Sequence, residues 1–185
     1  MKKIIITADD LGIDIETNKA IKESFENGVL TSSCLIANGE AFDDAVQNVI
    51  NKCEDFELGV HLNIIEGKAL TQKSASMITD SEGNFNNSYI DMLRHSFDKK
   101  YLEVLETEFR AQIKKILSAG LKPVYINSHV HTHSIPKIFD LVCKLANEYS
   151  IKNIRTQAEL PYYTKGIKRH TTIHYVLNIV KNIFY

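Results

Sequence analysis

Short apolar runs alternate along this chain with segments in which apolar residues recur every three or four positions, and this alternation restricts the fold more than any other feature. The apolar runs predict strands, and the segments between them predict helices that each bury one face. Strands joined by helices favour an α/β fold with a parallel sheet whose faces the helices cover. Five strands are expected, over residues 3–7, 29–37, 58–63, 124–128 and 153–156.

Capping and turn residues indicate where the helices between these strands begin and end. Gly28 stands where a left-handed C-cap is expected. Asp43 and Asp44 open the next helix, and Ser134 is expected to cap the helix after the fourth strand. The polar stretch over residues 66–87 predicts a long loop of the kind that carries function or mobility. The expected helices cover residues 20–25, 46–53, 102–117, 138–149 and 172–185.

The charge balance and the cysteines exclude several classes of protein. Lys and Arg number 22 against 23 Asp and Glu, so the chain lacks the basic excess of a nucleic-acid-binding protein. Its apolar runs fall short of the roughly 20 residues that a membrane span needs. The three cysteines lie far apart without a Cys-x-x-Cys pair, which favours a reduced, cytoplasmic setting. A single domain of 185 residues folds without a disulfide or metal, so any metal would serve function.

Polar clusters stand at the ends of three predicted strands. The carboxyl ends of parallel strands meet at one edge of a sheet, where α/β folds bind their ligands. We therefore expect the three clusters to form one site. They are Asp9-Asp10, His61-Leu62-Asn63 and His129-Val130-His131-Thr132-His133.

The histidine run places three imidazoles at alternate positions. On an extended backbone such residues point to the same side, so His129, His131 and His133 converge on one centre only where the chain stays strand-like. The alternative is a polar loop whose histidines cap helices. We favour a metal or acid–base site, because this spacing is improbable at the histidine frequency of the chain, 7 in 185 residues.

The aspartate doublet after the first predicted strand differs from the doublet Asp43-Asp44, which precedes a helix and can bind its first amides. Asp9 and Asp10 end an apolar strand, where carboxylates are costly unless they are paired or bind a metal. One carboxylate and two imidazoles suit a divalent cation with open positions, and the spacing leaves zinc, magnesium, manganese and cobalt as alternatives. A second, unligated aspartate beside the cation is what hydrolysis by an activated water needs.

Four motifs in a defined order carry a resemblance to the YdjC-like carbohydrate deacetylases, which include chitooligosaccharide deacetylase. The resemblance extends over nearly the whole chain. It implies a (β/α) barrel related to polysaccharide deacetylases, formed by one domain over residues 1–185 that lacks C-terminal elements of the family and is open on that side. The motifs are Thr7-Ala8-Asp9-Asp10-Leu11-Gly12, Asn27-Gly28-Val29-Leu30-Thr31-Ser32-Ser33, Gly59-Val60-His61-Leu62-Asn63 and Asn127-Ser128-His129-Val130-His131-Thr132-His133.

The resemblance also implies a reaction, in which the N-acetyl group is removed from N-acetylglucosamine-type sugars or chitooligosaccharides. Asp10, His61 and His129 match the ligands of one divalent ion, Mg2+ or Zn2+. Asp9 matches the catalytic carboxylate. The expected partner is thus a small amino sugar rather than a nucleic acid or a membrane.

Other positions have less specific counterparts. His133, or failing that His131, would protonate the departing amine. Asn63 and Arg155 are candidates for binding the sugar. The family commonly has an aspartate where this chain has Asn127, so a charge that would tune His129 is absent.

Two alternative functions remain open at this point. The first is a metal-dependent phosphoesterase or glycoside-phosphate hydrolase, although the motifs lack a basic cluster and a glycine-rich phosphate loop. The second is an inactive sugar- or metal-binding module in which Tyr162 and Tyr163 stack on a sugar ring. An open sheet edge and an apolar final helix would favour a homodimer.

Overall fold

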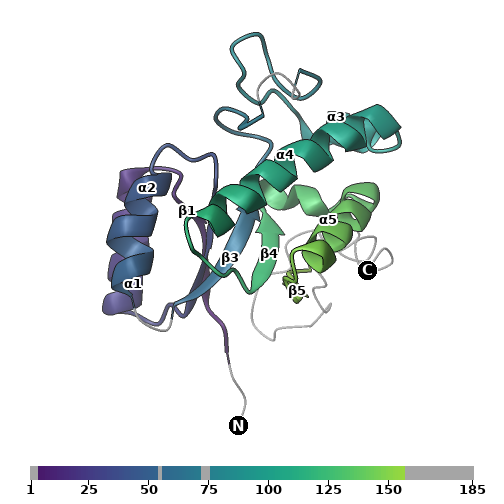
Figure 1. Cartoon of the computed structure of the whole chain (residues 1–185). Helices are drawn as coiled ribbons and strands as arrows, with labels where there is room; N and C mark the ends of the chain where they lie inside the picture. Colours follow the sequence, from purple (N-terminus) through teal and green to yellow (C-terminus); the bar gives the residue numbers. More distant parts are fainter. Residues whose placement is uncertain (1–3, 54–55, 72–75, 157–185) are drawn as a thin grey trace, which may run out of the picture. The chain divides into compact units, whose positions relative to one another are not determined.

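The computed structural model describes residues 4–53, 56–71 and 76–156, and the first compact unit of the chain ends at Ile154. This unit contains a parallel sheet of five strands in the order β1-β2-β3-β4-β5 (Figure 1). Strands that are neighbours both in sequence and in the sheet have the connectivity of a (β/α) barrel. The predicted α/β class with a parallel sheet is confirmed. The strands are β1 (Thr7–Leu11), β2 (Ser32–Leu35), β3 (Glu57–Leu62), β4 (Tyr125–Ser128) and β5 (Asn153–Ile154).

Helices connect successive strands and pack along the sheet (Figure 1). The long helix α4 (Lys99–Ser118) turns a row of fully buried side chains towards the core, including Leu105, Phe109 and Ile113, as its spacing predicts. No helix of the described residues is both long and apolar enough to cross a membrane. The helix expected over 172–185 lies outside the described residues. The helical elements are α1 (Ile15–Glu26), α2 (Phe42–Asp44), η1 (Ala45–Val49), η2 (Ile50–Lys52), α3 (Tyr89–His95), α4 (Lys99–Ser118), η3 (His129–Ser134) and α5 (Pro136–Glu148).

The first strand begins where the sequence predicts that it ends. The strand was expected over residues 3–7, but β1 begins at Thr7, and the side chains of Ile4 and Ile5 are exposed. The strand was expected there because β-branched residues favour an extended backbone. The prediction is wrong because pairing with the neighbouring strand sets where a strand begins and ends. Asp9 and Asp10 therefore lie within the strand rather than in a turn after it.

Two predicted helix caps are also wrong. Gly28 does not have the positive φ of a left-handed cap, and its lack of a side chain serves close packing instead. A Cβ atom at Gly28 would lie 2.5 Å from the carbonyl oxygen of Ser24. Ser134 does not cap α5, whose N-cap is Ile135 without a side-chain hydrogen bond. Pro136 in the first turn lacks an N–H group and so reduces the need for a capping side chain.

Two polar side chains of α4 hold the end of β3 and the loop that follows it. The amide of Gln112 bonds to both main-chain groups of Asn63, at 3.0 Å from its N–H and 2.6 Å from its oxygen. The carboxylate of Glu108 is fully buried and accepts hydrogen bonds from the main-chain N–H groups of Leu70 and Thr71. It also accepts from the Thr71 hydroxyl, so Glu108 fixes the loop through three hydrogen bonds, and a fourth, from the Gln112 amide, lies within α4.

We expect the Glu108→Ala substitution to lower the free energy of unfolding by about 3 kcal/mol, because it leaves several buried donors without an acceptor. Chemical denaturation monitored by circular dichroism measures this change. Glu103→Ala on the exposed face of the same helix is the matched control, with an expected change within about 0.5 kcal/mol. Equal stability of the two variants would show that Glu108 does not anchor the loop.

Candidate functional site

A β-bulge in β1 allows two successive aspartates to take part in one site. Residues that follow one another in a regular strand point to opposite faces. Between its pairs with Ser33 and Leu35 of β2, β1 holds one residue more than β2 does. Asp10 lies in this bulge with a φ of 68°, in the left-handed region. A residue other than glycine pays about 1 kcal/mol for this conformation, and such strain is concentrated at functional sites.

Asp10 lies between two histidines, one from β3 and one that directly follows β4. Its Oδ1 atom is 3.0 Å from Nε2 of His61 and 2.7 Å from Nδ1 of His129. The hydrogen bond to His129, and then the neighbouring imidazole of His61, hold the pKa of Asp10 well below its ordinary value. The same carboxylate raises the pKa of His129. Asp10 is therefore ionised at neutral pH and available as a ligand.

The donor atoms of Asp10, His61 and His129 fit a divalent cation. All three lie within 4.8 Å of one another. Nε2 of His61 is buried and forms no hydrogen bond, although Oδ1 of Asp10 is only 3.0 Å away. A buried polar atom without a partner is costly, and a bound cation would satisfy it. One carboxylate and two imidazoles would leave further coordination positions for water and substrate.

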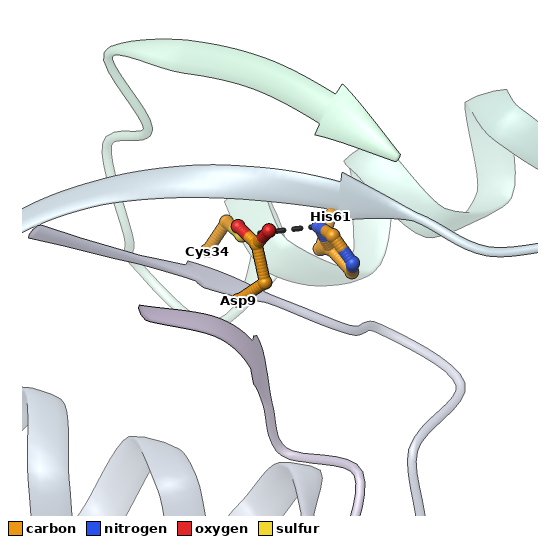
Figure 2. A group of neighbouring side chains, drawn as sticks. All are labelled: Asp9, Cys34 and His61. Carbon is orange, nitrogen blue, oxygen red and sulfur yellow. Dashed lines mark hydrogen bonds between the residues drawn. The ribbon is translucent and has the colours of Figure 1, made fainter. Parts of the chain in front are cut away.

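A second group of donors, Asp9, Cys34 and His61, overlaps the first at His61 (Figure 2). The Sγ atom of Cys34 is 3.1 Å from Oδ1 of Asp9 and 3.0 Å from Nδ1 of His61. Burial, and then the charge of Asp9, raises the pKa of the Cys34 thiol well above its ordinary value. A thiol binds metal as the thiolate, so this group is better suited to hydrogen bonding. The group containing Asp10 is the stronger candidate for a metal site.

The histidine run does not stay extended, so its three side chains do not share one side. Residues His129–Ser134 form the helical turn η3, in which Val130 and His131 have φ values of 51° and 55°. His129 alone of the run belongs to a metal-capable group of the described residues. His133 is buried, and its Nδ1 atom is 2.5 Å from the hydroxyl of Ser128. The role of His133 or His131 as an acid stays a prediction.

The two residues expected to bind sugar differ in their surroundings. Asn63 is buried and shapes the turn after β3, because its side-chain oxygen accepts from the N–H groups of Ile65 and Glu66. Its side-chain amide donates to the Oδ1 atom of Asn38 and to the Glu66 carbonyl. Arg155 is exposed and follows β5 in the sequence. Binding of substrate by either residue stays a prediction.

Three further residues contact the site, and sequence reasoning assigned none of them to these contacts. Oε1 of Glu66 lies 3.7 Å from Nε2 of His129, on a side chain that is 58% exposed. Cys34 and Asn127 contact His61 from β2 and β4. Asn127 of β4 pairs with His61 of β3 in the register of the sheet. The contact between these two residues could therefore be predicted once the two strands are aligned.

The fold and the site define an α/β protein in which aspartate and histidine side chains that could hold a cation gather at the carboxyl ends of parallel strands. Comparison with known families agrees with this class. The chain belongs to the YdjC-like protein family, whose pattern matches residues 3–181. The resemblance seen in the four motifs is thereby confirmed.

Curated relatives and a solved structure extend the comparison. The chain is 36% identical to a carbohydrate deacetylase of Clostridium beijerinckii, over 86% of this chain and 63% of that protein. It is 39% identical to a carbohydrate deacetylase of Listeria welshimeri, over 85% of this chain and 62% of that protein. A crystal structure from Enterococcus faecalis, described as that of a candidate cellobiose-phosphate cleavage protein, matches with a TM-score of 0.72 and 26% identity. That match covers 80% of this chain and 57% of the other, so the chain spans only part of each of these proteins.

Proposed function

We propose that the protein is a metal-dependent carbohydrate deacetylase that hydrolyses the N-acetyl group of N-acetylglucosamine-type sugars or chitooligosaccharides. The observation that carries the proposal is the group Asp10, His61 and His129 with a second aspartate, Asp9, directly beside it in the sequence. The relatives named carbohydrate deacetylase support the choice of reaction.

The donor set favours zinc over magnesium as the ion, because imidazole nitrogens suit zinc whereas magnesium prefers oxygen ligands. Asp10, His61 and His129 would hold the ion. A bound ion of this kind polarises a carbonyl oxygen and lowers the pKa of its water to about 7.

Residues of the chain would act as the base, as the acid and in sugar binding. Asp9 accepts the proton of the attacking water, and the hydrogen bonds that its Oδ1 atom receives from Cys34 and Asn127 hold the carboxylate in place. His133, or otherwise His131, protonates the amine that leaves. Asn63 and Arg155 would contact the sugar. A homodimer and a cytoplasmic location stay predictions.

The test is acetate release from N-acetylglucosamine and chitooligosaccharides by the purified protein, before and after removal of metal by a chelator. We expect acetate release that the chelator abolishes and added zinc restores. Full activity in metal-free protein would contradict the metal-dependent mechanism. Sugar binding without acetate release in zinc-loaded protein would instead identify a binding module.

A second candidate is hydrolysis of a phosphorylated disaccharide, which the description of the similar Enterococcus faecalis structure favours. Cellobiose phosphate separates the two functions because it carries no acetyl group. Release of phosphate or of free sugar from this substrate, with no acetate from chitooligosaccharides, would replace the deacetylase proposal.

A further inference from the structure

We propose that Asn127 is a positioning residue that couples His61, a ligand of the proposed metal, to Asp9, the proposed base. This inference rests on the proposed function. Asn127 is fully buried at the end of β4, and its side-chain amide contacts both residues. One amide group would thereby set the orientation of a ligand and of a catalytic carboxylate.

The orientation of the Asn127 amide follows from its partners. An ionised carboxylate can only accept hydrogen bonds, so the amide nitrogen faces Oδ1 of Asp9, at 3.0 Å. The amide oxygen therefore faces Nδ1 of His61, at 2.6 Å. This oxygen can only accept, so Nδ1 of His61 carries a hydrogen.

The position of that hydrogen decides which nitrogen of His61 can bind a cation. In a neutral imidazole with a hydrogen on Nδ1, the lone pair is on Nε2. Nε2 is the atom that faces Oδ1 of Asp10 at 3.0 Å without forming a hydrogen bond. A lone pair next to a carboxylate oxygen is repulsive unless a cation lies between them. Asn127 thus prepares His61 for metal binding through Nε2.

Two substitutions separate the two contacts of Asn127. Asn127→Asp keeps an acceptor for His61 but cannot donate to Asp9, and it places a second carboxylate beside that residue. Asn127→Leu removes both contacts. Asn87→Leu is the matched control, because Asn87 donates to the carbonyl groups of Ile64 and Ile78 and holds a loop instead.

Long-range 1H–15N NMR spectra of the metal-free protein, recorded above the pKa of its histidines, report which nitrogen of His61 carries the hydrogen. We expect the hydrogen on Nδ1 in the wild type, in Asn127→Asp and in the control, and a mixture of the two tautomers in Asn127→Leu. A hydrogen predominantly on Nε2 in the wild type, or an unchanged His61 in Asn127→Leu, would overturn the proposal. The NMR spectra do not depend on activity, so they test the role of Asn127 independently of the deacetylase function.

Zinc titration and initial rates test whether Asn127 affects zinc affinity through His61 and kcat through Asp9. We expect Asn127→Leu to weaken zinc binding about 10- to 100-fold, as is typical for partners of metal ligands. Asn127→Asp should bind zinc nearly as the wild type does, yet lower kcat at least about tenfold because its carboxylate repels that of Asp9. Equal zinc affinity in all variants would refute the coupling to His61, and an unchanged kcat in Asn127→Asp would refute the coupling to Asp9. Absence of both zinc binding and acetate release in the wild type would instead reject the proposed function.

Discussion

Asn in place of Asp9 is expected to lower acetate release about 100- to 10,000-fold, the range that a general base contributes. The substitution keeps the shape of the side chain and an oxygen that can accept from Cys34 and Asn127. It removes the charge that takes a proton from water. Metal content should stay at the wild-type level, because Asp9 is not among the proposed ligands.

The matched control for Asp9→Asn is Asp43→Asn, the first aspartate of the other doublet, which is exposed at the start of α2. We expect this variant to keep full activity. Acetate release measured by a coupled assay and zinc measured by elemental analysis separate the outcomes. Loss of zinc in Asp9→Asn would make Asp9 a ligand, and undiminished turnover would remove it from the mechanism.

His129→Ala should lower zinc affinity far more than Cys34→Ser does, because each residue belongs to only one of the two donor groups and the proposed ion lies in that of His129. We expect His129→Ala to weaken zinc binding more than about 100-fold. Loss of a residue that only hydrogen-bonds to a metal ligand already lowers metal affinity about 10- to 100-fold, and loss of a ligand should lower it further. Cys34→Ser keeps a hydrogen-bond donor near Asp9 and should change the affinity less than about threefold.

Competition titration against a chromogenic chelator measures both affinities. The reverse order, with Cys34→Ser losing zinc and His129→Ala keeping it, would place the ion among Asp9, Cys34 and His61. Cys34 is buried, so its substitution could also change the stability of the fold. Thermal denaturation of both variants therefore serves as the control for stability.

The sequence predicts the residue types of the site better than their arrangement. Asp10, His61 and His129 stand at three strand ends in the sequence, and the structure brings them together at one edge of the sheet. Their convergence follows from local information alone, because parallel strands have their carboxyl ends on the same side. The bounds of β1 could not be predicted this way, because the strand ends where its hydrogen bonds to β2 end.

The histidine run shows where local reasoning ends. Alternate spacing predicts a shared direction only for an extended backbone, and the left-handed φ values of Val130 and His131 turn the chain instead. Those values depend on contacts after β4, such as that between His133 and Ser128. His129 therefore reaches Asp10, 119 residues away in sequence, without the rest of the run.

The amino-acid sequence by itself determined the α/β class, the alternation of strands with helices, and the family, because periodicity and motifs are local properties of the chain. It did not predict α3. Only the tertiary structure decided the bulge at Asp10, the contact of Glu66 with His129, and the bridge that Asn127 forms between His61 and Asp9. These features join segments up to 118 residues apart through the register of neighbouring strands, and no local pattern records that register.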